Sequence, residues 1–219
     1  MKERQIISFA WKWLGEKEVH VLALPNFPGY RKNPDDNRAL VRKLYDLISR
    51  ADILVGHNVD GFDDKMANTD FICAGFPPPP AHKTVDTLRV ARERFRFNSN
   101  KLDDLGARLG LGRKVKTGGF SLWAGCLRGY PKSWDLMMRY NRQDVALLEK
   151  VYLRLRPWMK NHPDMNAADR HIGCPVCRSL KMVRWGRQIN AHGISIRYMC
   201  RDCGKCSSGK IIKNEMAFR

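Results

Sequence analysis

The chain has 219 residues and 43% hydrophobic content, which is enough for one medium-sized domain with a core and one small module. Lys and Arg outnumber Asp and Glu by 40 to 22. The resulting net charge of +18 favours a polyanionic partner, because basic surface gains affinity by displacing counterions from phosphates. Nucleic acid, either DNA or RNA, is the leading candidate. A membrane partner is disfavoured, since the sequence has no run of about 18 apolar residues.

The beginning of the sequence is not typical of a secretion signal. Lys12 interrupts its apolar stretch, and no small-residue cleavage site follows. Seven cysteines are also an awkward number for a secreted disulfide framework. A cytoplasmic protein with reduced thiols is therefore expected.

The first quarter of the chain predicts a hairpin followed by a helix. Residues 5–14 and 19–24 are rich in β-branched and aromatic residues and flank a polar turn, which indicates two paired strands. Residues 37–51 carry apolar side chains at helical spacing, with Asp35 or Asp36 as the candidate cap. The apolar positions are Leu40, Val41, Leu44, Leu47 and Ile48.

The pattern then alternates between strands and helices. Residues 53–58 and 83–88 are short strand candidates, separated by a helix candidate at 62–76. Residues 102–156 are mostly helical, and Pro157 ends the last helix. This alternation favours an α/β domain, a mixed sheet flanked by helices, over residues 1–162. Residues 163–172 are expected to be a linker, and 173–219 a small module.

The small module carries two Cys-x-x-Cys pairs, Cys174 with Cys177 and Cys200 with Cys203. Each pair can place two thiolates on one metal ion, and zinc prefers four such ligands in a tetrahedron. The segment between the pairs is expected to form a strand, a glycine-containing turn and a second strand. A structural Zn²⁺ is predicted, because the module has little core of its own. Alternative ligands are Cys206, His171 and His192.

Basic and aromatic residues alternate within the same module. Arginine and lysine are expected to contact phosphates there, and the aromatic rings either stack on bases or fill the core of the module. The candidate nucleic-acid contacts are Arg184, Arg187, Arg197 and Lys205, with Trp185 and Tyr198 among them.

Two stretches of the first domain carry candidate catalytic residues. Residues 56–63, GHNVDGFD, follow a predicted strand, and residues 140–144, YNRQD, lie inside a predicted helix. Tyr140 and Asp144 are four positions apart, so the phenol and the carboxylate share one helix face. A pair of this kind on its own usually forms a solvated helix edge, and its interest comes from the combination with Asn58 and Asp63.

These residues resemble the second and third motifs of the DEDD exonuclease superfamily, in its tyrosine-containing branch. Asn58, Phe62 and Asp63 match the second motif, and Tyr140 and Asp144 match the third. The connecting sequence is similar to phage and bacterial members related to the proofreading domain of family B polymerases. The resemblance covers residues 5 to 206 and implies a ribonuclease-H-like fold followed by a zinc ribbon. For a phage-encoded member, the location would be the host cytoplasm.

The resemblance implies 3′–5′ hydrolysis of phosphodiester bonds with two Mg²⁺ or Mn²⁺ ions. Asp63 and Asp144 would hold metal, Tyr140 would orient or help deprotonate the attacking water, and Asn58 would contact the terminal nucleotide. Carboxylates are natural ligands for these hard cations. Asp86 is expected to cap the helix that follows it. Asp60 and Asp64 are expected to face solvent.

The family's first motif, Asp-x-Glu on an opening strand that is normally central in the sheet, has no counterpart in this sequence, so the domain over residues 1–162 is expected to lack its first strand. The acidic residues before Asp35 are Glu3, Glu16 and Glu18, and none lies in an apolar strand. Three explanations stay open: a segment encoded or expressed separately, a shortened nucleic-acid-binding protein, or a substitute ligand such as Glu3. The competing functions are a metal-dependent exonuclease, a catalytically silent binding module that serves a partner enzyme, and a structure-specific or RNA-directed nuclease.

Overall fold

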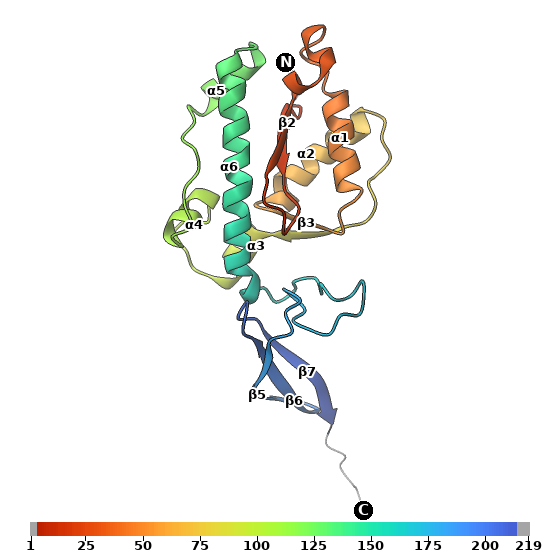
Figure 1. Ribbon diagram of the computed structural model, residues 1–219, viewed down its shortest axis with the longest axis vertical. Coiled ribbons are helices and arrows are strands. Elements are labelled where there is room, and N and C mark those ends of the chain that lie inside the picture. Colours follow the sequence, from red (N-terminus) through yellow and green to blue (C-terminus); the bar gives the residue numbers. More distant parts are fainter. Residues whose placement is uncertain (1–3, 214–219) are drawn as a thin grey trace, which may run out of the picture. The chain divides into compact units, whose positions relative to one another are not determined.

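A computed structural model describes residues 4–213, and the chain divides into two compact units, Met1–Tyr152 and Leu153–Arg219. The first unit combines helices with two pairs of strands, and the second is built around three strands (Figure 1). None of the helices within residues 4–213 is long and apolar enough to cross a membrane.

The predicted hairpin is present at the start of the first unit. Strand β1 (Ser8–Trp11) pairs antiparallel with β2 (His20–Ala23), and Ser8 lies opposite Ala23. Both strands are shorter than predicted. An ion pair between Lys12, just after β1, and Glu149 ties the hairpin to the last helix of the unit.

A second pair of strands is parallel. Strand β3 (Ile53–Gly56) lies beside β4 (Lys83–Asp86), and Gly56 is in register with Asp86. No strand within residues 4–213 joins this pair to the hairpin, so the expected single mixed sheet is instead two separate two-stranded sheets. The mixed sheet that the resemblance implies is not formed as one sheet among these residues, because no described strand is hydrogen-bonded to both pairs.

Six helices complete the described part of the first unit. The longest begins at Pro131, five residues before its predicted start, since proline is well tolerated in a first helical turn. It ends at Leu155 before a 3₁₀ turn at Arg156–Trp158, as Pro157 predicts. Two further 3₁₀ turns follow β2, at Leu24–Asn26 and Pro28–Arg31. The helices are α1 (Arg38–Ile48), α2 (Asp64–Cys73), α3 (Thr87–Arg94), α4 (Leu102–Arg108), α5 (Phe120–Leu127) and α6 (Pro131–Leu155).

The main core lies between the hairpin and the helices on its two sides. Figure 1 shows α6 on one side of β2 and α1 on the other. Burial of this apolar surface is the main force that holds hairpin and helices together. The buried side chains that meet here are Ile7, Ala23, Leu24, Leu40, Leu122, Cys126, Trp134 and Met137. A second cluster joins α1 to α2 through Val41, Ile48, Ala67 and Phe71.

The start of α1 differs from the predicted cap. The N-cap residue is Asn37, and its amide donates to Asp70 Oδ2 at 3.0 Å and makes no cap bond to the helix. The buried carboxylate of Asp70 also accepts from the backbone of Ile6 at 2.8 Å. Asp36 still accepts a hydrogen bond from the first turn of α1, since the backbone nitrogen of Arg38 donates to its Oδ1 at 3.0 Å.

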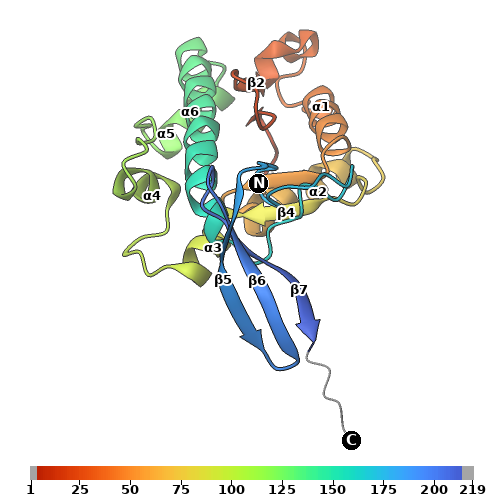
Figure 2. The ribbon, with the colours of Figure 1, turned by 60° about the horizontal axis from the view of Figure 1, so that its bottom comes forward.

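The second unit contains the predicted strand, turn and strand, followed by a third strand. Strands β5 (Met182–Asn190), β6 (Gly193–Cys200) and β7 (Cys206–Lys213) form one antiparallel sheet in that order (Figure 2). The register places Met182 opposite Cys200, so the turn brings the two cysteine pairs together. The segment expected to be a linker is also hydrogen-bonded here, since Asn166 Nδ2 donates to the backbone oxygen of Gly173 at 3.1 Å.

Candidate functional site

A tight turn between β3 and α2 places the second candidate motif. Asn58 adopts a left-handed backbone conformation, with φ of 68°, and a π-helical turn at Val59–Asp63 leads into α2. Two glycines make this turn possible. A Cβ atom on Gly56 would lie 2.4 Å from the Cβ of Val59, and one on Gly61 would lie 2.6 Å from Asn58 Oδ1. A larger residue at either position would displace the motif.

Asp86, at the end of β4, holds this turn from the neighbouring strand. Its Oδ1 accepts from the backbone nitrogens of Leu88 at 2.9 Å and Arg89 at 3.4 Å, which confirms the predicted cap of α3. The same oxygen accepts from the backbone nitrogen of Asn58 at 2.8 Å. Asp86 is 4% exposed, so this buried carboxylate fixes the turn to the end of the parallel strand pair.

Asp63 ends the π-helical turn and has an unusual electrostatic environment. The loss of water around it, and then the charge of Asp86, raise its pKa to about 6, against opposing effects of a backbone hydrogen bond and of Lys114. Asp63 nevertheless keeps an exposed surface. It is mostly ionised at pH 7 and available to a cation from solvent.

The third candidate motif lies on α6 and meets a lysine from the loop between α4 and α5. Lys114 Nζ donates to Asp144 Oδ2 at 2.6 Å and to the hydroxyl of Tyr140 at 3.3 Å. Asp144 Oδ1 is buried and has no hydrogen-bond partner. Tyr140 and Asp144 therefore lie on one helix face, as predicted, and the ammonium of Lys114 neutralises the charge of Asp144. Because Lys114 also acts on the charge of Asp63, the two motifs share one electrostatic environment.

The phenol of Tyr140 stays protonated in this environment. Its burial, followed by the neighbouring charge of Asp144, raises its pKa above the ordinary value, although Lys114 opposes this. A neutral phenol can orient a water molecule by hydrogen bonding, but it is a poor base. Of the two roles that the sequence left open for Tyr140, orientation fits this geometry better than deprotonation.

Sequence reasoning missed Lys114 and His57. The Nδ1 of His57 lies 2.9 Å from the hydroxyl of Thr87, and that hydroxyl donates to the backbone oxygen of Gly56 at 2.9 Å. Burial lowers the pKa of His57, against the effect of a backbone hydrogen bond with Asn100 and the charge of Asp86, so the ring is neutral. His57 stands inside the quoted motif, whereas nothing in the sequence near Lys114 marks it.

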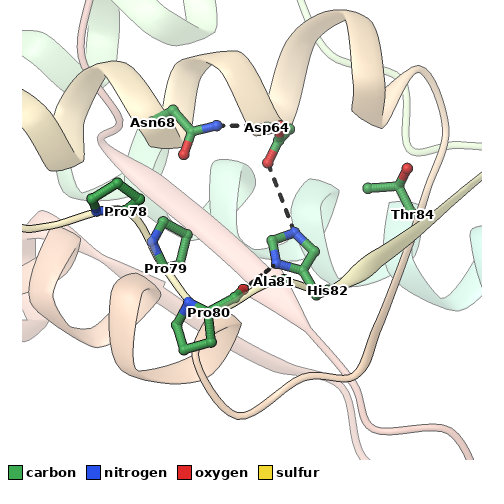
Figure 3. A pocket seen from close by; sticks show the side chains of 8 residues that line it. All are labelled: Asp64, Asn68, Pro78, Pro79, Pro80, Ala81, His82 and Thr84. Atoms are coloured by element: carbon green, nitrogen blue, oxygen red, sulfur yellow. Dashed lines mark hydrogen bonds and ion pairs between the residues drawn. The ribbon is translucent and has the colours of Figure 1, made fainter.

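Asp60 and Asp64 are partly exposed, with 33% and 30% of their side chains open to solvent, and each also contacts a neighbouring side chain. Asp60 forms an ion pair of 2.7 Å with Arg89. Asp64 Oδ2 accepts from Asn68 at 3.2 Å, and its other oxygen lies 4.0 Å from His82 Nε2 across a proline-walled hollow (Figure 3). Asp63, Tyr140 and Asp144 are absent from the wall of this hollow, which is formed by Asp64, Asn68, Pro78, Pro79, Pro80, Ala81, His82 and Thr84.

The carboxylates present only partly fit a divalent-metal site. The orphaned Oδ1 of Asp144 is a suitable oxygen ligand, and Asp63 is a second carboxylate in the same environment. Two ions ordinarily need more ligands than this. Apart from four cysteines, no three His, Cys, Asp or Glu side chains converge within residues 4–213. The suggested substitute, Glu3, lies outside the described residues.

Comparison with known families settles what kind of domain this is. A family model described as the RNase_H superfamily matches residues 6–156. The chain belongs to the RNase_H superfamily. Membership supports a nuclease-like function on a nucleic-acid substrate, and nucleases of this fold typically use divalent metal ions. A search of the curated proteins found no match.

In the second unit of this RNase_H superfamily protein, four cysteine sulfurs converge. The Sγ atoms of Cys174, Cys177, Cys200 and Cys203 all lie within 4.8 Å of one another. Two of the distances, from Cys174 to Cys203 and from Cys177 to Cys200, are 3.6 Å. A tetrahedral zinc site with Zn–S bonds of about 2.3 Å has S–S edges of about 3.8 Å, so this donor set fits zinc. Cys206, His171 and His192 are outside the cluster.

The basic residues of the second unit have different surroundings. Arg184, Arg187 and Arg197 are exposed on β5 and β6, where a bulge in β5 separates the first two. Trp185 projects from this bulge and is 55% exposed, so it does not fill the core of the module. Lys205 differs, because its ammonium donates to the backbone oxygen of Met159 and is held within the unit.

Proposed function

We propose that the first unit is a 3′–5′ exonuclease-type domain that uses Mg²⁺ or Mn²⁺ on DNA or RNA, and that the second unit is a zinc ribbon. The observation that supports this proposal is the contact of Lys114 with Tyr140 and Asp144, together with the effect of the same lysine's charge on Asp63, more than 70 positions earlier in the sequence. Folding has no general need for such an arrangement, and a carboxylate with a raised pKa, such as Asp63, is more common at functional sites than elsewhere.

Each proposed residue has a role that suits its surroundings. Asp144 would offer its unpartnered Oδ1, and Asp63 its exposed carboxylate, to a divalent ion. The ion would neutralise the charge of the phosphodiester. Tyr140 would orient a water molecule through its neutral phenol. Asn58 lines a hollow that also includes Arg89 and Arg92. Asn58 would contact the terminal nucleotide there, and the two arginines would contact the phosphates of that nucleotide.

The described residues lack the further carboxylates of a two-metal site, so slow hydrolysis is expected from them alone. An added peptide or fused segment with an apolar Asp-x-Glu strand should restore Mn²⁺-dependent cleavage. Such a strand could pair with the unpaired backbone groups at an edge of β1 or β3. The added segment would correspond to a separately encoded or expressed segment, one of the three explanations for the missing first motif.

The test is cleavage of end-labelled oligonucleotides in Mn²⁺, with and without the added strand. Cleavage should proceed from the 3′ end only when the strand is present. In the restored protein, Asp144→Asn should abolish cleavage and leave nucleic-acid affinity largely intact. If the unmodified chain cleaves at rates typical of enzymes and Asp63→Asn stops it, a ligand outside the described residues must complete the site, and Glu3 should then be substituted first.

The second candidate function is a catalytically silent nucleic-acid-binding module that serves a partner enzyme. The ion pair between Lys114 and Asp144 favours it, because an internal cation already neutralises the carboxylate. The two functions differ in their need for added metal. A nuclease depends on Mg²⁺ or Mn²⁺, whereas a phosphate-binding module keeps its affinity without them while zinc remains in the ribbon.

The ribbon is the proposed main nucleic-acid contact. Arg184, Arg187 and Arg197 would meet phosphates, and the exposed ring of Trp185 would stack on a base, as in other single-strand binders. Because Lys205 is held by a backbone oxygen, its contribution should be the smallest of the four. Trp185→Ala should therefore weaken binding to single strands more than binding to duplexes.

A further inference from the structure

The carboxylate of Asp144 already has a cation. Lys114 Nζ lies 2.6 Å from Asp144 Oδ2, while the buried Oδ1 has no partner. Both side chains are largely covered, with 27% of Lys114 and 20% of Asp144 exposed. A Mg²⁺ or Mn²⁺ ion binds carboxylate oxygens at about 2.1 Å. An ammonium and a divalent ion on the same shielded carboxylate would repel one another strongly, so the two compete for it.

The position of Lys114 is set by the backbone of its loop. Its backbone nitrogen donates to Asp103 Oδ1 at 2.6 Å. The preceding carbonyl, of Arg113, accepts from Gln143 Nε2 at 3.2 Å, next to Asp144 on α6. The ammonium also lies 5.2 Å from the centre of the Tyr140 ring, within the range of a cation–π contact. The backbone contacts hold the loop in place beside α6, so only the side chain of Lys114 has to move for its ammonium to leave Asp144.

We propose that Lys114 is a built-in competitor of the divalent ion at Asp144. A divalent ion binds Asp144 only when the ammonium leaves, and the phosphate of a bound nucleic acid is the group that takes the ammonium over. This inference rests on the proposed role of Asp144 as a metal ligand. Metal and nucleic acid then bind cooperatively, because each favours the state in which Lys114 has left Asp144, and the coupling must be reciprocal.

A matched pair on the same helix separates this role from an ordinary ion pair. Lys12 and Glu149 join β1 to α6, and this pair is also largely covered, with 12% and 23% of the side chains exposed. Both pairs leave a shielded carboxylate when the lysine is removed. Lys114 also contacts the phenol of Tyr140, and its charge acts on Asp63, so a divalent ion is expected to replace Lys114 at Asp144 and not Lys12 at Glu149.

The experiment compares zinc-loaded wild type with Lys114→Met, Lys12→Met and Lys116→Met. Lys116 is exposed on the same loop and controls for loss of surface charge. Free Mn²⁺ is followed by its electron paramagnetic resonance signal during titration, and melting temperatures are recorded with and without Mn²⁺. Each titration is repeated with a short single-stranded phosphorothioate oligonucleotide that resists cleavage.

Lys114→Met should bind Mn²⁺ at least about tenfold more tightly than wild type in the absence of oligonucleotide, a change of about 1.4 kcal/mol. Adding Asp144→Asn should remove this gain. Without Mn²⁺, both Lys114→Met and Lys12→Met should melt about 3–8 °C lower, and Mn²⁺ should restore only Lys114→Met. The oligonucleotide should tighten Mn²⁺ binding to wild type and have little effect on Lys114→Met. If Lys114→Met does not fold, Lys114→Gln retains a hydrogen-bond donor without the charge.

Two negative results have different meanings. If wild type and Lys114→Met bind Mn²⁺ equally and Asp144→Asn weakens both, Asp144 is a metal ligand but Lys114 is no competitor, and this inference is overturned. If Asp144→Asn changes Mn²⁺ binding in neither background, the metal site of the proposed function is wrong, and the inference fails with it.

Discussion

Asp63→Asn should stabilise the protein at neutral pH, and the size of the effect follows from the shifted pKa. The native state raises the pKa of Asp63 from 3.8 to about 6. Its native carboxyl therefore holds a proton more tightly than in the unfolded chain, and ionisation disfavours the fold. This penalty is absent below about pH 4, grows as the pH rises to 6 and is complete above that. Asparagine has the same shape and no charge, so it removes the penalty.

A shift of about two pKa units corresponds at most to about 3 kcal/mol. Asp63 keeps an exposed surface, and solvent screening reduces this to on the order of 1 kcal/mol. For a protein of this size, that is an increase in melting temperature of about 2–4 °C. Differential scanning calorimetry at pH 7.5 and pH 4 measures it, and the gain should vanish at pH 4.

The neighbouring Asp64 provides the control for this substitution. Asp64 accepts a hydrogen bond from Asn68, so Asp64→Asn should give no gain in stability at pH 7.5. If Asp63→Asn is no more stable than wild type at pH 7.5, or if its gain persists unchanged at pH 4, the carboxylate is not held in an unfavourable environment. The electrostatic argument for a functional Asp63 would then lose its support.

Three further outcomes are expected. Zinc analysis should find one ion per chain, and less than about half a zinc per chain in carefully prepared protein would contradict this. Cys174→Ser should unfold the second unit, while the first unit keeps its melting transition. Nucleic-acid affinity should fall steeply with salt and depend little on base sequence, so a flat plot of log affinity against log salt would count against the basic surface. Gly56→Ala should displace the buried Val59 and lower the melting temperature by several degrees, because its Cβ would lie 2.4 Å from the Cβ of Val59. Gly29→Ala, which has open space around its Cβ position, should change the melting temperature little by calorimetry.

The parts of the fold predicted correctly are those set by local sequence patterns. The hairpin follows from two short β-rich runs and a polar turn, and the end of α6 follows from Pro157. The cysteine cluster follows from the spacing of two chelating pairs, which limits the geometry more than any other signal in the chain. The cap of α3 by Asp86 follows from its place between a strand and a helix.

The features that the sequence did not predict depend on contacts between distant positions. Lys114 lies in an irregular loop, and its importance comes from Asp144, 30 positions later. The partner of Asp60 is Arg89, 29 positions later, and no periodic pattern links them. The separation of the two strand pairs is also non-local, because strand pairing depends on which edges meet in space and not on the composition of each strand.

The way in which Asp86 binds the backbone affects how a mutational scan of this protein should be interpreted. Loss of function on removal of an acidic residue close to Asp63 would ordinarily be attributed to catalysis. All three backbone nitrogens that Asp86 contacts donate to a single oxygen, Oδ1. An asparagine amide can supply that one oxygen, whereas alanine cannot. A scan limited to alanine would therefore assign Asp86 to the catalytic group, and a parallel asparagine scan would separate it from carboxylates that need their charge.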